Sequence, residues 1–213
     1  EGRIPYRDIF DFQMPGSFAA YSFLGFLSGF DGFRIRILDL ILLGTLLTST
    51  FFSMRRFGKT TAMAAAILFG LKYLEGGPSM SLQREYLLLI FIALAVCIVM
   101  RDDLTPRHRL LIGLLFGLSA VIKPHAAIGL LPILLFDITD MVRRLKLTLL
   151  DASMKSILPT LAGFAVPVSM MIAWLAVTGS LIPFFDIAVH YWPLYSQIDG
   201  QLVINDGAGR IPF

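Results

Sequence analysis

The sequence predicts an all-α polytopic membrane protein. Of its 213 residues, 56% are hydrophobic and only 15% are charged, whereas a soluble globular domain carries about 25% charged residues. The apolar residues lie in long runs, and most Lys and Arg residues gather in clusters between those runs. Together these observations indicate helices that cross a bilayer and keep their basic connections on one side of it.

The apolar runs give the positions of the expected helices. A helix needs about 20 residues to cross a hydrocarbon core about 30 Å thick, and two runs reach that length cleanly. In order, the runs are 14–30, 35–54, 60–74, 86–100, 110–122, 125–141 and 156–178. We expect about six transmembrane helices among them. The first run, 14–30, either crosses the membrane or forms a shallow, interfacial helix.

The basic clusters orient these helices. They comprise Arg55, Arg56 and Lys59, then Arg101, Arg107 and Arg109, and finally Arg143, Arg144, Lys146 and Lys155. Such clusters mark the cytoplasmic side, so the alternation of helices places Glu85, Lys123 and His125 at the external side. All clusters share one side only if 110–141 forms two short helices with a bend at Lys123-Pro124, and proline favours such a bend.

Several polar residues near the expected external ends are candidates for chemistry. Asp8 and Asp11 would share one face of a helix, and paired carboxylates suit proton abstraction or metal binding; a solvated loop is the alternative. Glu85 opens an apolar run, where an acid also stabilises a helix N-terminus. Lys123 lies at membrane depth, where its ammonium must extend to the interface or meet an anion.

Other charged residues have simpler interpretations. Arg36 and Asp39 are three residues apart and predict a structural ion pair. Asp137 and Asp140 end a helix beside Arg143 and Arg144, and we expect structural roles for them.

The segment after the last crossing is rich in aromatic residues, namely Phe184, Phe185, Tyr191, Trp192 and Tyr195. Aromatic residues at such a place typically form an interfacial belt. His190 and Asp186 are four residues apart and could pair, so a substrate-binding role for His190 and Tyr191 is the alternative to the belt.

Signatures of soluble enzyme classes are missing from the sequence. It contains no HExxH, CxxC, GxGxxG or GxxxxGK[ST] motif. The single Cys97 excludes a disulfide within the chain. The net charge of +3 fits membrane topology, and we expect no nucleic-acid partner.

Four stretches, taken in order, resemble a known family. The opening G-x-I-P-Y-R-D-x-F-D-F-x-x-P-G resembles the first external loop of GT-C membrane glycosyltransferases, in particular glycosyltransferase family 39, with the protein mannosyltransferases and lipid A aminoarabinose transferase. The stretches S-L-Q-R-E-Y-L-L-L, G-L-L-F-G-L-S-A-V-I-K-P-H and W-L-A-V-T-G-S-L-I-P-F-F-D follow in the family order. The resemblance implies a GT-C-type transmembrane helix bundle. Residues 1–34 would be part of the first external loop with an interfacial helix, 35–179 the bundle, and 180–213 the start of a later external loop.

The resemblance also implies an activity and a set of site residues. Such enzymes move a sugar from a polyprenyl-phosphate donor to a glycan, lipid or protein acceptor at the external face of a membrane, here the bacterial cytoplasmic (inner) membrane. The catalytic candidates are Asp8, Asp11 and Glu85. The candidates for binding the lipid phosphate are Arg7, Lys123 and His125, and those for binding substrate are His190 and Tyr191. A divalent metal ion is left open, because some relatives use one and others do not.

This chain departs from the family pattern in two ways. The first helix of the family and the acid pair after it are expected upstream of Glu1, together with the main catalytic base. Many relatives also have a lysine before the proline of the opening loop, where this chain has Gln13 and Met14.

Two other functions are weighed against the transferase. A transporter or lipid flippase would have a charged path that reaches the cytoplasmic half of the membrane, whereas the polar candidates here gather at external ends. A non-catalytic membrane subunit would leave the acids merely solvated.

Overall fold

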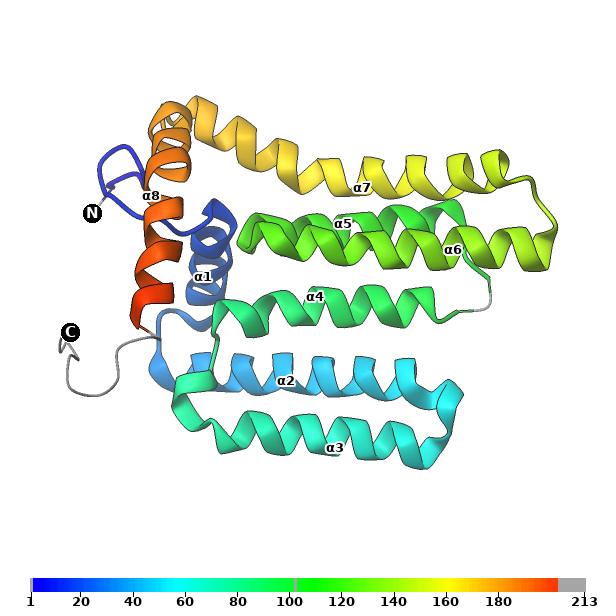
Figure 1. Cartoon of the computed structure of the whole chain (residues 1–213). Helices are drawn as coiled ribbons and strands as arrows, with labels where there is room; N and C mark the ends of the chain where they lie inside the picture. Colours follow the sequence, from blue (N-terminus) through cyan, green and yellow to red (C-terminus); the bar gives the residue numbers. More distant parts are fainter. Residues whose placement is uncertain (1, 102, 203–213) are drawn as a thin grey trace. The chain divides into compact units, whose positions relative to one another are not determined.

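The computed structural model describes residues 2–101 and 103–202, and in that part of the chain every regular element is a helix (Figure 1). The only β pairing among these residues is an isolated bridge between Pro5 and Ile9. The predicted all-α class is therefore confirmed. The chain divides into two compact units, Met14–Met170 and a smaller unit made of Glu1–Gln13 with Met171–Phe213.

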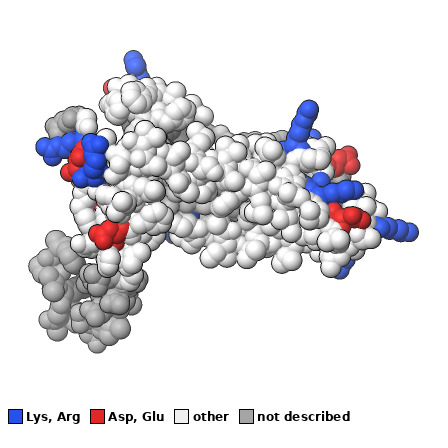
Figure 2. Space-filling view, turned by 90° about the horizontal axis from the view of Figure 1, so that it is seen from above, with Lys and Arg blue, Asp and Glu red and all other residues white. Residues whose placement is uncertain are grey.

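From α2 (Gly32–Met54) onward, the larger unit is a bundle in which successive helices run in opposite directions (Figure 1). Its elements are α1 (Pro15–Ser28), α2 (Gly32–Met54), η1 (Arg55–Phe57), α3 (Lys59–Glu75), η2 (Gly77–Met80), α4 (Arg84–Val99), α5 (Pro106–Ile122), η3 (Pro124–Gly129), α6 (Leu130–Leu145) and most of α7 (Leu149–Val177). Helix α2 packs against α3 and α4, and α4 packs against α5. The alternation places the basic connections at one end of the bundle, which we call the basic end, and Glu85 and Lys123 at the opposite end. Figure 2 shows Lys and Arg side chains gathered at the basic end, beyond a mostly white surface.

Capping residues explain why helices begin earlier than the apolar runs. Asp31 accepts a hydrogen bond from the backbone N–H of Arg34 at 2.9 Å and so starts α2. Thr105 caps α5 in the same way through His108, and Pro106 occupies the first turn. Helix α5 therefore has 17 residues, four of them polar or proline residues that precede the predicted start at 110.

The predicted bend at Lys123-Pro124 is present. Helix α5 ends at Ile122, and Lys123 has an extended backbone with φ −143° and ψ 114°. The 3-10 helix η3 follows and leads into α6. The bend gives two antiparallel helices in place of one long crossing, so both of their basic ends lie together.

Within the part of the chain that the structure describes, three helical stretches are long and apolar enough to cross a membrane: Gly32–Phe57, Pro124–Leu145 and Leu149–Val177. The sequence predicted two at full length, and the third arises because η3 extends α6. Helices α1, α3, α4 and α5 have 14 to 17 residues, or about 21–26 Å of helix. The total of about six crossings stays a prediction.

Helix α1 contacts the ends of other helices at the end opposite the basic end. The Ser17 hydroxyl lies 3.5 Å from the carbonyl oxygen of Ile122, and the Tyr21 hydroxyl donates to the carbonyl of Leu82 at 2.9 Å. In Figure 1, α1 lies across the direction of α2 to α6. This placement supports an interfacial helix, which stays a prediction.

Helices α5 and α7 approach so closely that only glycine fits at their contact. A Cβ atom added at Gly113 would lie 1.8 Å from the carbonyl oxygen of Thr160, and one added at Gly163 would lie 1.9 Å from that of Leu110. Small residues at four-residue spacing, here Gly113 and Gly117, allow such contacts between helices in membranes.

Replacing Gly113 with alanine is expected to destabilise the protein by about 1–3 kcal/mol, because the added methyl group forces the two backbones apart. The matched control is Gly44→Ala in α2, where an added Cβ meets nothing within 4 Å. The control should be neutral or stabilising by up to about 1 kcal/mol, because alanine favours a helix over glycine. Thermal unfolding of both variants in detergent measures the difference, and equal unfolding temperatures would contradict the close contact.

The smaller unit joins the opening residues to α8 (Leu181–Leu202). The Ser180 hydroxyl donates to the carbonyl of Pro5 at 3.0 Å, and the Trp192 indole donates to that of Phe12 at 3.0 Å. Residues 181–202 are thus helical, and the assignment of 180–213 to the start of a later external loop stays a prediction. Residues 203–213 lie outside the described part, and the side of the membrane that this segment occupies stays a prediction.

The aromatic residues of α8 do not all have the exposure that an interfacial belt requires. Phe184 is buried against Tyr6, with ring centroids 5.1 Å apart, and Tyr191 contacts Phe10 at 5.0 Å. Phe185 is exposed, as a belt requires. The side chain of Tyr195 lies outside the described residues. Several of the aromatic residues therefore hold the opening segment in place.

Candidate functional site

The candidate residues fall into two groups, one in each unit. In the smaller unit, the Asp8 carboxylate accepts hydrogen bonds from Nε and Nη2 of Arg7 at 2.9 and 3.0 Å. It also accepts one from the backbone N–H of Ile4 at 2.9 Å, and Arg7 Nη1 donates to the carbonyl of Thr178 at 3.1 Å. Both side chains remain accessible, with 32% of the Asp8 side chain and 46% of the Arg7 side chain exposed.

The electrostatics of this group limit what Asp8 can do. The Arg7 guanidinium, followed by the Ile4 amide, lowers the pKa of Asp8 to about 2. Asp8 is therefore ionised throughout the neutral range and is a weak proton acceptor, because an efficient general base has a pKa near the working pH. Its geometry suits orientation of a hydroxyl or attraction of a cation better than removal of a proton.

Asp8 and Asp11 are not on a helix, so the shared helical face does not exist. Residues 4–9 form a tight turn in which Tyr6 has a positive φ of 69° and the Asp8 N–H donates to the carbonyl of Ile4. Asp11 accepts from the backbone N–H of Gln13 at 2.8 Å, and Gln13 in turn accepts from the Tyr6 hydroxyl. Each acid is used in a local turn. Among the described residues, no group of three or more His, Cys, Asp and Glu side chains could hold a metal ion.

His190 and Asp186 form the pair that their spacing predicts. The ring Nδ1 of His190 lies 3.0 Å from a carboxylate oxygen of Asp186, and both side chains are well exposed. Tyr191, beside His190, is 44% exposed. These residues of α8 are in the same unit as Arg7 and Asp8 and are accessible to a ligand.

In the larger unit, Glu85 and Lys123 form an ion pair. Glu85 lies in the first turn of α4 and Lys123 directly after α5, and these two helices pack together. The Lys123 side chain is 22% exposed, and the Glu85 side chain is 56% exposed. The sequence placed both at the external side, and the structure brings them into contact. His125 is exposed two residues further along, in η3.

A buried carboxylate supports the start of α4. Asp39 of α2 is 5% exposed and accepts from the Tyr73 hydroxyl at 2.6 Å and from the Ser81 hydroxyl at 2.9 Å. The Tyr86 hydroxyl approaches the backbone carbonyl of Asp39 at 3.4 Å, and Tyr86 is the neighbour of Glu85. The prediction that Asp39 pairs with Arg36 was wrong. The sequence did contain a signal for the buried network, because an acid within an apolar helix requires a partner inside the bundle.

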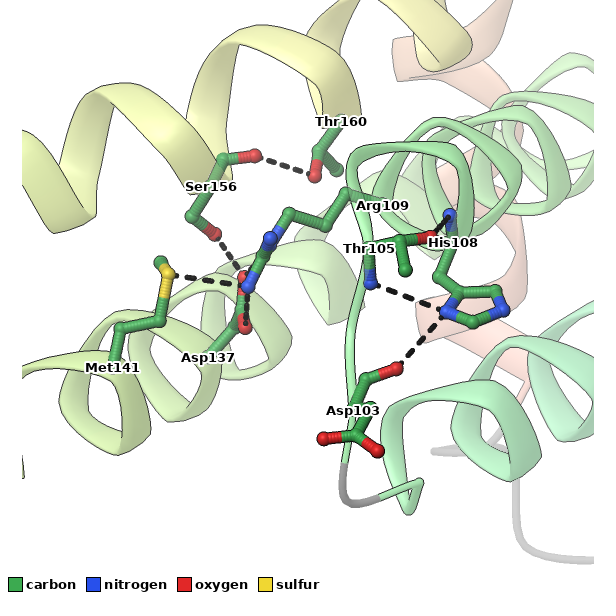
Figure 3. Close-up of polar contacts among 8 residues, drawn as sticks. All are labelled: Asp103, Thr105, His108, Arg109, Asp137, Met141, Ser156 and Thr160. Atoms are coloured by element: carbon green, nitrogen blue, oxygen red, sulfur yellow. Dashed lines mark hydrogen bonds and ion pairs between the residues drawn. The ribbon is translucent and has the colours of Figure 1, made fainter. Parts of the chain in front are cut away.

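The basic end holds a second buried network, which is structural (Figure 3). Arg109 of α5 donates to both carboxylate oxygens of Asp137 in α6, at 2.7 and 3.0 Å. The Ser156 hydroxyl of α7 donates to the same carboxylate at 2.6 Å. Asp140 pairs with Arg144 at 2.8 Å. We expected structural roles for both acids, but the helix-joining partner Arg109 could not be foreseen.

These features define an all-α membrane protein whose candidate polar groups lie at helix ends. The family model described as dolichyl-phosphate-mannose-protein mannosyltransferase matches residues 15–174. The chain belongs to this family, whose members are membrane glycosyltransferases of the mannosyltransferase type. A comparison with curated proteins and one with solved structures gave no match.

The matched residues contain one group of candidates and not the other. Glu85, Lys123 and His125 lie within 15–174, whereas Arg7, Asp8 and His190 lie outside it. The likeness of the opening stretch therefore remains a resemblance.

Proposed function

We propose that the chain is part of a membrane glycosyltransferase that moves a sugar from a polyprenyl-phosphate donor to an acceptor at the external face. The observation that carries the proposal is the ion pair of Glu85 and Lys123 at the bundle end opposite the basic end. A lysine at this level reaches the depth at which a lipid phosphate lies. The family supports a lipid-linked sugar as donor.

The transfer assigns a role to each group. The acceptor hydroxyl attacks the sugar C1 atom and gives its proton to a carboxylate, while the bond between C1 and the phosphate oxygen breaks and the phosphate keeps the electron pair. Lys123 stabilises the negative charge on the departing phosphate, and His125, in the same unit, is a further phosphate contact. Arg7, in the smaller unit, is a separate candidate for binding the lipid phosphate. Glu85, Asp8 and Asp11 orient or deprotonate the acceptor, and the low pKa of Asp8 favours orientation. His190 and Tyr191 contact the substrate.

The direct test is transfer of labelled sugar from polyprenyl-phosphate mannose by the full-length protein in proteoliposomes. We expect product only when the donor carries the phosphate-linked lipid, and none from a soluble nucleotide sugar. Uptake of a solute across the membrane without transfer would instead support a transporter.

Accessibility labelling tests the sidedness on which the proposal depends. In a Cys97→Ala background, His125→Cys is expected to react with an impermeant thiol reagent from outside intact cells, because His125 is exposed at the proposed external end. The matched control is Lys59→Cys, which is exposed at the basic end and should react only after the cells are opened. Labelling of Lys59→Cys from outside, with His125→Cys reactive only in opened cells, would contradict the placement of Lys123 at the external face.

A further inference from the structure

A notch at the basic end of the larger unit gathers arginines from three separate segments. It is lined by Arg56 of η1, Arg101 two residues after the end of α4, and Arg144 of α6. Asp140 is the one acid among the described lining residues. We call this site the arginine notch, and it is at the end of the bundle opposite the proposed transfer site. Figure 2 shows the basic side chains of this end projecting past the white surface of residues that are neither Lys, Arg, Asp nor Glu.

The arginine notch has more positive than negative charge among its described side chains, and this excess would attract an anion. Asp140 pairs with Arg144 at 2.8 Å and so offsets one of the three guanidinium groups. Arg56 is held instead by uncharged groups, because Nη1 lies 3.2 Å from the Met100 sulfur and its guanidinium lies 5.6 Å from the Phe57 ring centroid. Neither contact neutralises it. The described side chains of the notch therefore present about two net positive charges, and guanidinium groups bind phosphate oxygens in forked geometry.

The adjoining cavity has the opposite balance and excludes the alternative location for an anion. Three acids, Asp103, Asp137 and Asp140, line it together with Arg109 and Arg144. Arg109 is already bound to both carboxylate oxygens of Asp137. An anion at the basic end is thus attracted to the arginine notch and repelled by its neighbour.

The apolar lining of the notch indicates the kind of anion. Val99, Met100, Leu104 and Phe136 line the same notch. Val99 is buried, whereas Phe136, one helical turn before Asp140, is 39% exposed and open to a ligand. The helix ends here are at headgroup level if α2 and α6 cross the membrane, as their length and composition allow. Basic pockets between transmembrane helices on the cytoplasmic side suit phospholipid headgroups. A free phosphate would leave the apolar lining without a partner.

We propose that the arginine notch binds the phosphate headgroup of an anionic membrane phospholipid, with the start of its acyl chains against Phe136. The lipid occupies a site distinct from that of the sugar donor, since the two lie at opposite ends of the bundle.

Native mass spectrometry of the full chain in detergent, with added phosphatidylglycerol or phosphatidylcholine, tests this proposal. We expect retention of phosphatidylglycerol by the wild type and a loss of about tenfold in the Arg56→Gln/Arg101→Gln variant, because two charged contacts are removed. The matched control, Arg143→Gln/Lys146→Gln, removes the same charge from exposed positions of the same end outside the notch. It should retain the lipid within about twofold, as expected of exposed charges.

Three outcomes would overturn the proposal. Equal loss in the two double variants would show a diffuse attraction without a site. Equal retention of phosphatidylcholine by the wild type would remove the requirement for an anion. Displacement by millimolar inorganic phosphate would identify a free-phosphate site. Unchanged thermal unfolding of both double variants would show that any loss concerns binding. Arg101→Lys keeps the charge without the forked geometry. Its retention of phosphatidylglycerol should lie between that of the wild type and that of the Arg56→Gln/Arg101→Gln variant.

Discussion

Replacing Lys123 with alanine is expected to lower sugar transfer about 100- to 1,000-fold while the protein stays folded. Removing one group that stabilises developing negative charge has an effect of this size on turnover. The partner Glu85 is 56% exposed, so its carboxylate stays hydrated and the free energy of unfolding should change by less than about 1 kcal/mol. Lys123→Arg keeps the charge and should restore part of the activity.

The chain offers a matched control for this variant. Lys72 forms an exposed ion pair with Glu75 at 3.0 Å, at the same end of the bundle, where α3 leads into η2. Lys72→Ala removes the same charge and should keep transfer within about twofold. Turnover measured with saturating and with limiting donor separates a binding defect from a chemical one. Equal losses in Lys123→Ala and Lys72→Ala would mean that the charge of this end matters and Lys123 itself does not.

Removing Asp137 is expected to have the largest effect on stability. The Asp137→Ala variant should lose about 3–5 kcal/mol, because Arg109 would be left as an unpaired charge inside the bundle. Arg109 and Asp137 are only 6% and 5% exposed, and the carboxylate also binds Ser156 of α7 (Figure 3). Denaturant unfolding in detergent measures the loss.

Two further variants distinguish a buried ion pair from a general need for charge. Replacing both partners, as Arg109→Met with Asp137→Leu, should recover most of the stability, because apolar groups need no compensation. The control Asp140→Ala breaks an exposed pair with Arg144 and should change stability by at most about 1 kcal/mol. A double variant as unstable as Asp137→Ala would contradict the assignment.

The helices were predictable because their signal is local. The apolar runs located both ends of α2 within three residues. They located the end of α7 within one residue but placed its start seven residues too late, and the proline at 124 located the bend. The start of α5 was missed because its first turn is polar and depends on the Thr105 cap. The helix over 181–202 was missed because Pro183 and Pro193 and the aromatic residues resemble a loop composition.

The partners of the polar groups were less predictable, because they depend on how each helix is rotated. Helix α4 is apolar all round, and a helix without a polar face gives no indication of which side meets its neighbours. Alternation of the chain placed Glu85 and Lys123 at one end, yet their contact depends on the packing of α4 on α5. The same uncertainty hid the contact of Asp39 with Tyr73, which joins α2 to α3.

The pairing of Lys123 with Glu85 bears on how an enzyme at a membrane surface would choose its donor. Because the Glu85 carboxylate pairs with the Lys123 ammonium, a site without donor would present little net charge to the water outside. Dilute anions in that water would have to displace a tethered competitor whose local concentration is high. A phosphate on a lipid diffuses within the plane of the bilayer. Its local concentration at Lys123 would therefore also be high, so that it could compete with the Glu85 carboxylate. The ion pair would thus act as a filter that admits membrane-borne phosphates in preference to dissolved ones.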